Sequence, residues 1–102
     1  MSYLERDQKA EADVKSAIVL LLGEDAIDHI EVRPVEDQAG EPGLAVTIFL
    51  KSAPREPMPG SLLLDTIAAA AMALRENDDF RFPYVTFLAP EYEAAEDTRP
   101  TA

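Results

Sequence analysis

GLAVTIFL, residues 43–50, is a short run rich in β-branched and aliphatic residues with turn-forming residues around it. Side chains alternate between the two faces of a strand, so one face carries Leu44, Val46, Ile48 and Leu50. The other face carries Ala45, Thr47 and Phe49. A strand that is apolar on both faces is typical of the inside of a sheet that is covered on each side. The sequence therefore predicts a sheet arranged around this strand, which is an architecture and not an activity.

A second strand is predicted before it, over residues 27–35. Ile30 and Val32 alternate there with Glu31 and Arg33, which indicates one solvated face. Pro34 cannot donate a hydrogen bond to a neighbouring strand, so this strand ends near Pro34 or lies at an edge. Residues 36–43 contain glycine and proline and are predicted to form a hairpin loop.

A third strand is predicted over residues 80–88, FRFPYVTFL. Its alternation places Val85 and Phe87 on one face. The other face carries Phe82, Tyr84, Thr86 and Leu88. Pro83 favours an edge position, or one in which the missing N–H faces away from a neighbouring strand.

Two helices are predicted, over residues 2–22 and 62–76. Apolar residues recur every three or four positions in both segments. Gly23 is a natural residue to follow the end of the first helix, and Ser61 is predicted to cap the start of the second. The alanine run 68–71 favours helix and would let a sheet or another helix approach closely.

Two segments are predicted to lack regular structure. SAPREPMPG, residues 52–60, carries three prolines and reads as an extended connection. Residues 91–102 are acidic and weakly hydrophobic, and we expect a flexible C-terminal tail. A chain of 102 residues is typical of one domain, so residues 1–90 are predicted to form a single compact α+β domain.

The predicted order α-β-β-α-β defines an α+β fold, a three-stranded sheet with two helices packed on one face. The last strand should run parallel to strand 43–50. It can pair with that strand, or with strand 27–35 as in split β-α-β units. Pro34 and the apolar character of residues 43–50 favour the first arrangement, with residues 43–50 in the centre.

Composition restricts the partners that the chain can bind. Twenty acidic residues against nine basic ones give a formal net charge of −11, which would repel nucleic acid and acidic membrane surfaces. The Gly-x-x-Gly loop with which KH-type domains clamp a nucleic-acid backbone is absent before the second helix. The chain has no cysteine, and its first residues carry mixed charge without an apolar run. We therefore expect a cytoplasmic protein that binds neither nucleic acid nor membrane.

No pattern of catalytic or metal-binding residues stands out. His29 is the one histidine, and adjacent strand residues point to opposite faces, so Asp28 and His29 are not expected to converge on a metal. Nucleotide-binding loops and nucleophile motifs are absent from the sequence. We expect no cofactor, no metal site, no catalytic residue and no enzymatic activity.

The leading functional hypothesis comes from the second face of the sheet. Two helices can cover one face of three strands, which leaves apolar side chains on the other. The candidate contact residues are Phe49, Phe82, Tyr84 and Leu88. We expect a small non-catalytic protein–protein interaction module, a homodimer through this face or through a sheet edge.

Two alternatives remain open on sequence grounds. The acidic clusters at 24–41 and 91–97 suit an inhibitor or antitoxin-like partner of a basic protein. The proline-rich connection could instead form one wall of a pocket in a small enzyme.

Overall fold

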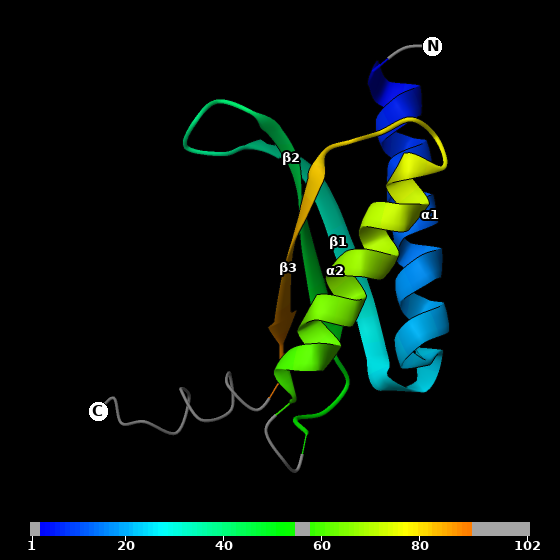
Figure 1. Cartoon of the computed structure of the whole chain (residues 1–102). Helices are drawn as coiled ribbons and strands as arrows, with labels where there is room; N and C mark the ends of the chain where they lie inside the picture. The colour runs from blue at the N-terminus through cyan, green and yellow to red at the C-terminus, as the bar shows by residue number, and fades with distance from the viewer. Residues whose placement is uncertain (1–2, 55–57, 91–102) are drawn as a thin grey trace, which may run out of the picture.

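Two helices lie side by side on one face of a three-stranded sheet in the computed structural model, which describes residues 3–54 and 58–90 (Figure 1). In chain order the elements are α1 (Tyr3–Leu22), the short 3-10 helix η1 (Glu24–Ala26), β1 (Ile27–Glu36), β2 (Pro42–Leu50), α2 (Gly60–Arg75) and β3 (Phe82–Leu88). The predicted α+β fold and its α-β-β-α-β order are confirmed. None of the described helices combines the length and the apolar character needed to cross a bilayer.

The sheet has the order β1-β2-β3, so β2 is the central strand. β1 pairs with β2 antiparallel, and β2 pairs with β3 parallel. In the register, Val46 of β2 lies between Val32 of β1 and Val85 of β3. Of the two strand orders that the sequence allowed, the structure has the one with residues 43–50 in the centre.

The core lies between the central strand and the helices. Leu44, Val46 and Ile48 are at most 1% exposed and contact the apolar stripes of the two helices. Those stripes contribute Val14 and Ile18 from α1, and Ala70 and Leu74 from α2, all buried. The faces assigned to β2 by alternation are therefore correct, since the residues expected to share a face with Leu44 are the ones that the helices bury.

The helix ends agree with the sequence in one case and differ in another. Gly23 has φ of 90°, which favours glycine, and its N–H donates to the Val19 carbonyl at 2.8 Å, ending α1 as expected. The prediction that Ser61 caps α2 is wrong. The helix begins at Gly60, Pro59 is its N-cap, and the Leu62 N–H donates to the Pro59 carbonyl at 3.0 Å. Pro59 has the extended backbone, φ −67° and ψ 146°, that is typical of the residue before the first helical one.

Two predictions lie outside the described residues: the flexible tail at 91–102 and the middle of the proline-rich connection at 55–57. β3 begins at Phe82 and not at Phe80; Asp79 and Arg81, just before it, belong to a side-chain network that is described below.

Candidate interaction surface

The sheet face opposite α1 and α2, called here the outer face, carries all four predicted contact residues. No described helix covers this face (Figure 1). Its residues alternate along each strand with those that point into the core. They are His29, Glu31, Arg33 and Val35 from β1, Gly43, Ala45, Thr47 and Phe49 from β2, and Phe82, Tyr84, Thr86 and Leu88 from β3.

Three of the four predicted contact residues are well exposed. Phe82 is 49% exposed, Tyr84 42% and Leu88 41%, while Phe49 on the central strand is half-buried. Scattered single hydrophobic residues are normal on protein surfaces, but aromatic residues gathered on one flat face are more typical of a contact surface.

Strand register arranges the outer face in four rows that run across the sheet. From one end to the other the rows are His29–Phe49–Leu88, Glu31–Thr47–Thr86, Arg33–Ala45–Tyr84 and Val35–Gly43–Phe82. The two end rows are mainly apolar. The middle rows carry one acid and one base, Glu31 and Arg33, both on β1. Apolar ends therefore flank a polar band that holds charges of both signs.

At one end of the outer face, Tyr84 lies over Gly43. A Cβ built at Gly43 would come within 2.7 Å of Tyr84 Cε2, closer than real Cβ atoms approach, and within a tight 3.2 Å of the Phe82 carbonyl oxygen. Phe82 packs edge-to-face on Tyr84, with ring centroids 4.9 Å apart. Glycine at position 43 thus lets the tyrosine ring rest directly on the strand.

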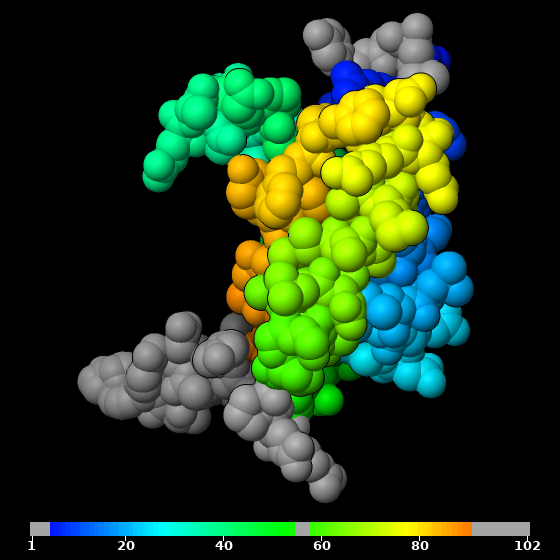
Figure 2. Space-filling model, viewed as in Figure 1, coloured from blue at the N-terminus to red at the C-terminus, as the bar shows by residue number. Residues whose placement is uncertain are grey.

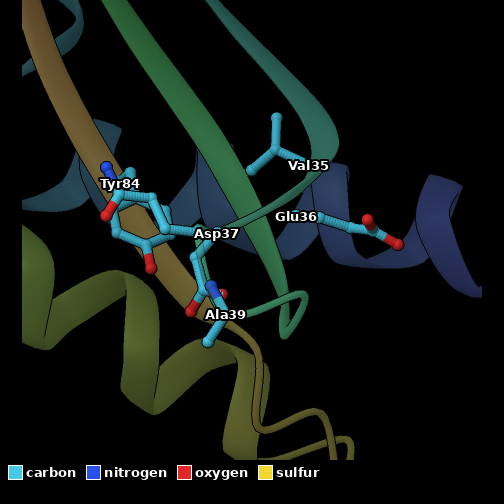
Figure 3. A pocket seen from close by; sticks show the side chains of 6 residues that line it. Val35, Glu36, Asp37, Ala39 and Tyr84 are labelled. Carbon is cyan, nitrogen blue, oxygen red and sulfur yellow. Dashed lines mark hydrogen bonds between the residues drawn. The ribbon is translucent and has the colours of Figure 1, made fainter.

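The β1–β2 hairpin forms a wall beside Tyr84. It bends away from the helices, toward the side of the outer face, and leaves a hollow against the body of the molecule (Figures 1 and 2). This open hollow has a volume of about 640 Å³ and is lined by Tyr84 and the hairpin residues 35–39, which are drawn in Figure 3. The Asp37 carboxylate accepts hydrogen bonds from the N–H groups of Ala39 and Glu41, both at 2.8 Å, so the turn is held by its own side chain.

At the other end of the outer face, His29 stacks on Phe49 with ring centroids 4.1 Å apart and planes 9° apart. Nδ1 of His29 lies 2.7 Å from the Asp28 carboxylate, and Nε2 lies 3.5 Å from that of Glu31. The expectation that Asp28 and His29 diverge is therefore wrong. The β1–β2 register shifts between Ile27 and His29, and this irregularity turns adjacent side chains toward each other.

A second hollow of about 450 Å³ lies beside this stack. Phe49 and Leu88 line it, together with Asp28, His29 and the single base Lys51. The outer face thus has a hollow at each end. The acidic β1–β2 hairpin lines one of them, and the Lys51 side chain lines the other. Among the described residues, no three histidine, aspartate or glutamate side chains are grouped so that they could hold a metal ion.

A buried ion-pair network that the sequence did not predict lies on the helical side. Asp79, 3% exposed by its side chain, accepts hydrogen bonds from the Arg81 guanidinium at 2.6–3.2 Å. Arg81 also reaches Asp7 on α1 at 2.8 Å, and Arg6 lies 3.3 Å from Asp79. Burial works to raise the pKa of Asp79, but the hydrogen bonds from Arg81 and the two positive charges outweigh it and lower that pKa. The network joins the α2–β3 connection to α1.

The helices carry exposed apolar side chains as well. Leu20 is 87% exposed, Leu64 67% and Met72 65%. Leu20 and Met72 line an open hollow of about 640 Å³ between α1 and α2, together with the small residues Ala17 and Ala73. These side chains are aliphatic and come from separate helices, in contrast to the aromatic residues held by register on the outer face.

Comparisons with known proteins do not assign a family. No protein-family model matches the chain, and no curated protein matches it. Among solved structures, an acyl-CoA synthetase from Brucella canis contains a similar region, with 19% sequence identity and a TM-score of 0.49. The match covers 76% of this chain but 13% of the synthetase chain. We draw no functional conclusion from a similarity at this level.

Proposed function

We propose that this chain is a non-catalytic protein–protein interaction module that forms a homodimer through the outer face of its sheet. One observation carries the proposal: both helices lie on one face, while the opposite face presents Phe49, Phe82, Tyr84 and Leu88. Burying such side chains against a second surface removes apolar area from water, which is the main driving force of association.

The outer face suits this role better than the exposed aliphatic residues of the helices. Its strands fix the positions of the aromatic rings, and Tyr84 rests directly on Gly43. Preorganised aromatic residues lose little freedom on binding and often dominate interface energy. Leu20 and Met72 are aliphatic side chains with several rotamers and would have to be ordered on contact.

The charges of the outer face favour a second copy over a strongly basic partner. Arg33 and Lys51 lie near Glu31 and Asp28, so the face itself carries both signs. A basic partner would meet two cations at the surface that it covers. A second copy can match each sign with its opposite. The inhibitor or antitoxin-like role and the enzyme role remain predictions from the sequence, as does the cytoplasmic location.

The experiment is a mass measurement by light scattering over a wide range of protein concentration. The wild-type chain should move from monomer to dimer as concentration rises. Leu88→Glu places a carboxylate on the outer face at a position that is already 41% exposed, so the chain should fold and stay monomeric.

Leu64→Glu is the matched control. It makes the same chemical change on α2, at a residue that is 67% exposed. It should dimerise like the wild type. A wild-type chain that stays monomeric at every concentration contradicts the proposal. Equal loss of dimer in both variants would also contradict it, because the contact would then not be confined to the outer face.

A further inference from the structure

We infer that the two copies pack face to face about a two-fold axis that runs across the strands, so that Glu31 of each subunit pairs with Arg33 of the partner subunit. This inference rests on the proposed function and specifies its geometry. Stacked sheets keep their strands roughly aligned, and a dimer of identical faces is related by a two-fold axis between them. That axis then runs either across the strands or along them.

An axis across the strands brings the charges together. It sets β1 over β1 of the partner subunit and reverses the row order, so that the row of Glu31 lies over the partner's row of Arg33. The contact occurs twice by symmetry. Both side chains are exposed, and Arg33 makes no ion pair with any described residue. The charges of the two central rows therefore face opposite charges on a second copy.

An axis along the strands gives no such match. It sets β1 over β3 of the partner subunit, row on the same row. Glu31 would then face Thr86 of the partner subunit, and Arg33 would face the partner's Tyr84. Each of these charges would then be desolvated against a neutral residue of the partner subunit, which is costly.

The position of the β1–β2 hairpin also favours a two-fold axis across the strands. It bends toward the side of the outer face (Figure 1), so a partner has to accommodate it. With the axis along the strands, both hairpins lie at the same end and compete for one space. With the axis across the strands they lie at opposite ends. Each hairpin, which carries Asp37 in its turn, then lies over the end of the partner subunit where Lys51 lines a hollow.

The size of the face requires the hairpins to take part. Three strands about 4.8 Å apart, with four outward residues each, form a flat area of roughly 350 Å² per subunit. Two such areas fall short of the roughly 1,600 Å² of a standard specific interface. Contacts from both hairpins add to the buried area when the axis runs across the strands. A weak dimer with a micromolar Kd is the expected result.

Charge reversal tests this geometry. E31R places two positive charges against each other at each contact, and R33E places two negative charges there. Each variant should raise the dimer Kd by roughly tenfold or more. Mixed together, the two variants should form a heterodimer, because both positions are basic in the E31R chain and both are acidic in the R33E chain. The double variant E31R/R33E should dimerise by itself with a Kd near that of the wild type.

Native mass spectrometry distinguishes the heterodimer, because the two single variants differ in mass. Circular dichroism verifies that each variant is folded, which the exposure of both positions favours. E76R and R75E are the controls. They make the same charge changes at exposed positions at the end of α2 and should leave the Kd unchanged.

The outcomes separate this inference from the proposed function. If E31R and R33E both dimerise as tightly as the wild type while Leu88→Glu does not, the outer face is the interface but the axis is wrong. The axis is also wrong if E31R and R33E each dimerise more weakly than the wild type and their mixture forms no tighter heterodimer. If the wild-type chain is monomeric throughout, the inference and the proposed function both fail.

Discussion

Arg81 and Asp79, two residues apart in the α2–β3 connection, form an ion pair that is almost entirely buried. Arg81 Nη2 donates to Asp79 Oδ2 at 2.6 Å and Nε donates to Oδ1 at 2.9 Å, with side chains 9% and 3% exposed. The free Nη1 group reaches Asp7 on α1. A short connection is thereby fastened to a helix more than seventy residues earlier in the sequence.

Removing the arginine should destabilise the fold strongly. Arg81→Met keeps an unbranched side chain of similar length but leaves Asp79 buried without its main partner. We expect a loss of about 3–5 kcal/mol in the free energy of unfolding, measured by urea denaturation. Arg75→Met, at an exposed position on α2, should change that free energy by less than about 0.5 kcal/mol. A loss below about 1 kcal/mol in Arg81→Met would mean that the network does not hold the connection.

The same pair predicts an acid-dependent stability. The pKa of Asp79 is lowered in the folded state, so its ion pair contributes fully above the pKa of the unfolded chain. That contribution is lost as pH falls through the lowered folded-state pKa, below about pH 4. The wild type should therefore have a higher free energy of unfolding than Asp79→Asn at pH 7. The difference between the two chains should shrink toward pH 3.

Urea denaturation of both chains at several pH values measures that gap. Asp65→Asn, at an exposed position on α2, controls for the loss of one negative charge and should show little gap at any pH. A gap between the wild type and Asp79→Asn that stays constant or widens below pH 4 would contradict the assignment.

A side chain at Gly43 should cost stability while Tyr84 is present. In Gly43→Ala the new Cβ would lie 2.7 Å from Tyr84 Cε2, so the ring or the strand has to move. We expect a destabilisation of about 1–3 kcal/mol, measured by thermal or urea unfolding. In a Tyr84→Ala background the cost should fall, though the Phe82 carbonyl oxygen at 3.2 Å keeps part of it. Equal costs in both backgrounds would show that the tyrosine ring is not the obstacle.

Most of the correct sequence predictions rest on the alternation of side chains between the two faces of a strand. The faces of β2 and β3 follow from a period of two residues, and the burial of Leu44, Val46 and Ile48 agrees with it. All four predicted contact residues lie on the outer face for the same reason, Phe49 and Leu88 toward one end and Phe82 and Tyr84 toward the other. Their role as an interface stays a proposal, because no partner is present to show it.

Features that depend on irregular backbone or on contacts between distant residues were not predicted from the sequence. Asp28 and His29 converge because the strand register shifts beside them, which strict alternation cannot foresee. Asp79 and Arg81 are close in sequence, but their burial depends on Asp7 and Arg6 of α1. The bend of the hairpin over one face has no periodic signal either.

Two adjacent residues of β2 test which face of the sheet is the contact surface and which face belongs to the core. Phe49 faces outward and is half-buried beneath His29, whereas Ile48 faces the helices and is fully buried. Phe49→Glu should leave a folded chain that no longer dimerises, since the carboxylate can reach water on the outer face. Ile48→Glu should unfold the chain, because an unpaired charge would be forced into the core. Circular dichroism measures folding, and light scattering measures mass. Unfolding of the Phe49→Glu chain would show that Phe49 belongs to the core and that the outer face is not the contact surface.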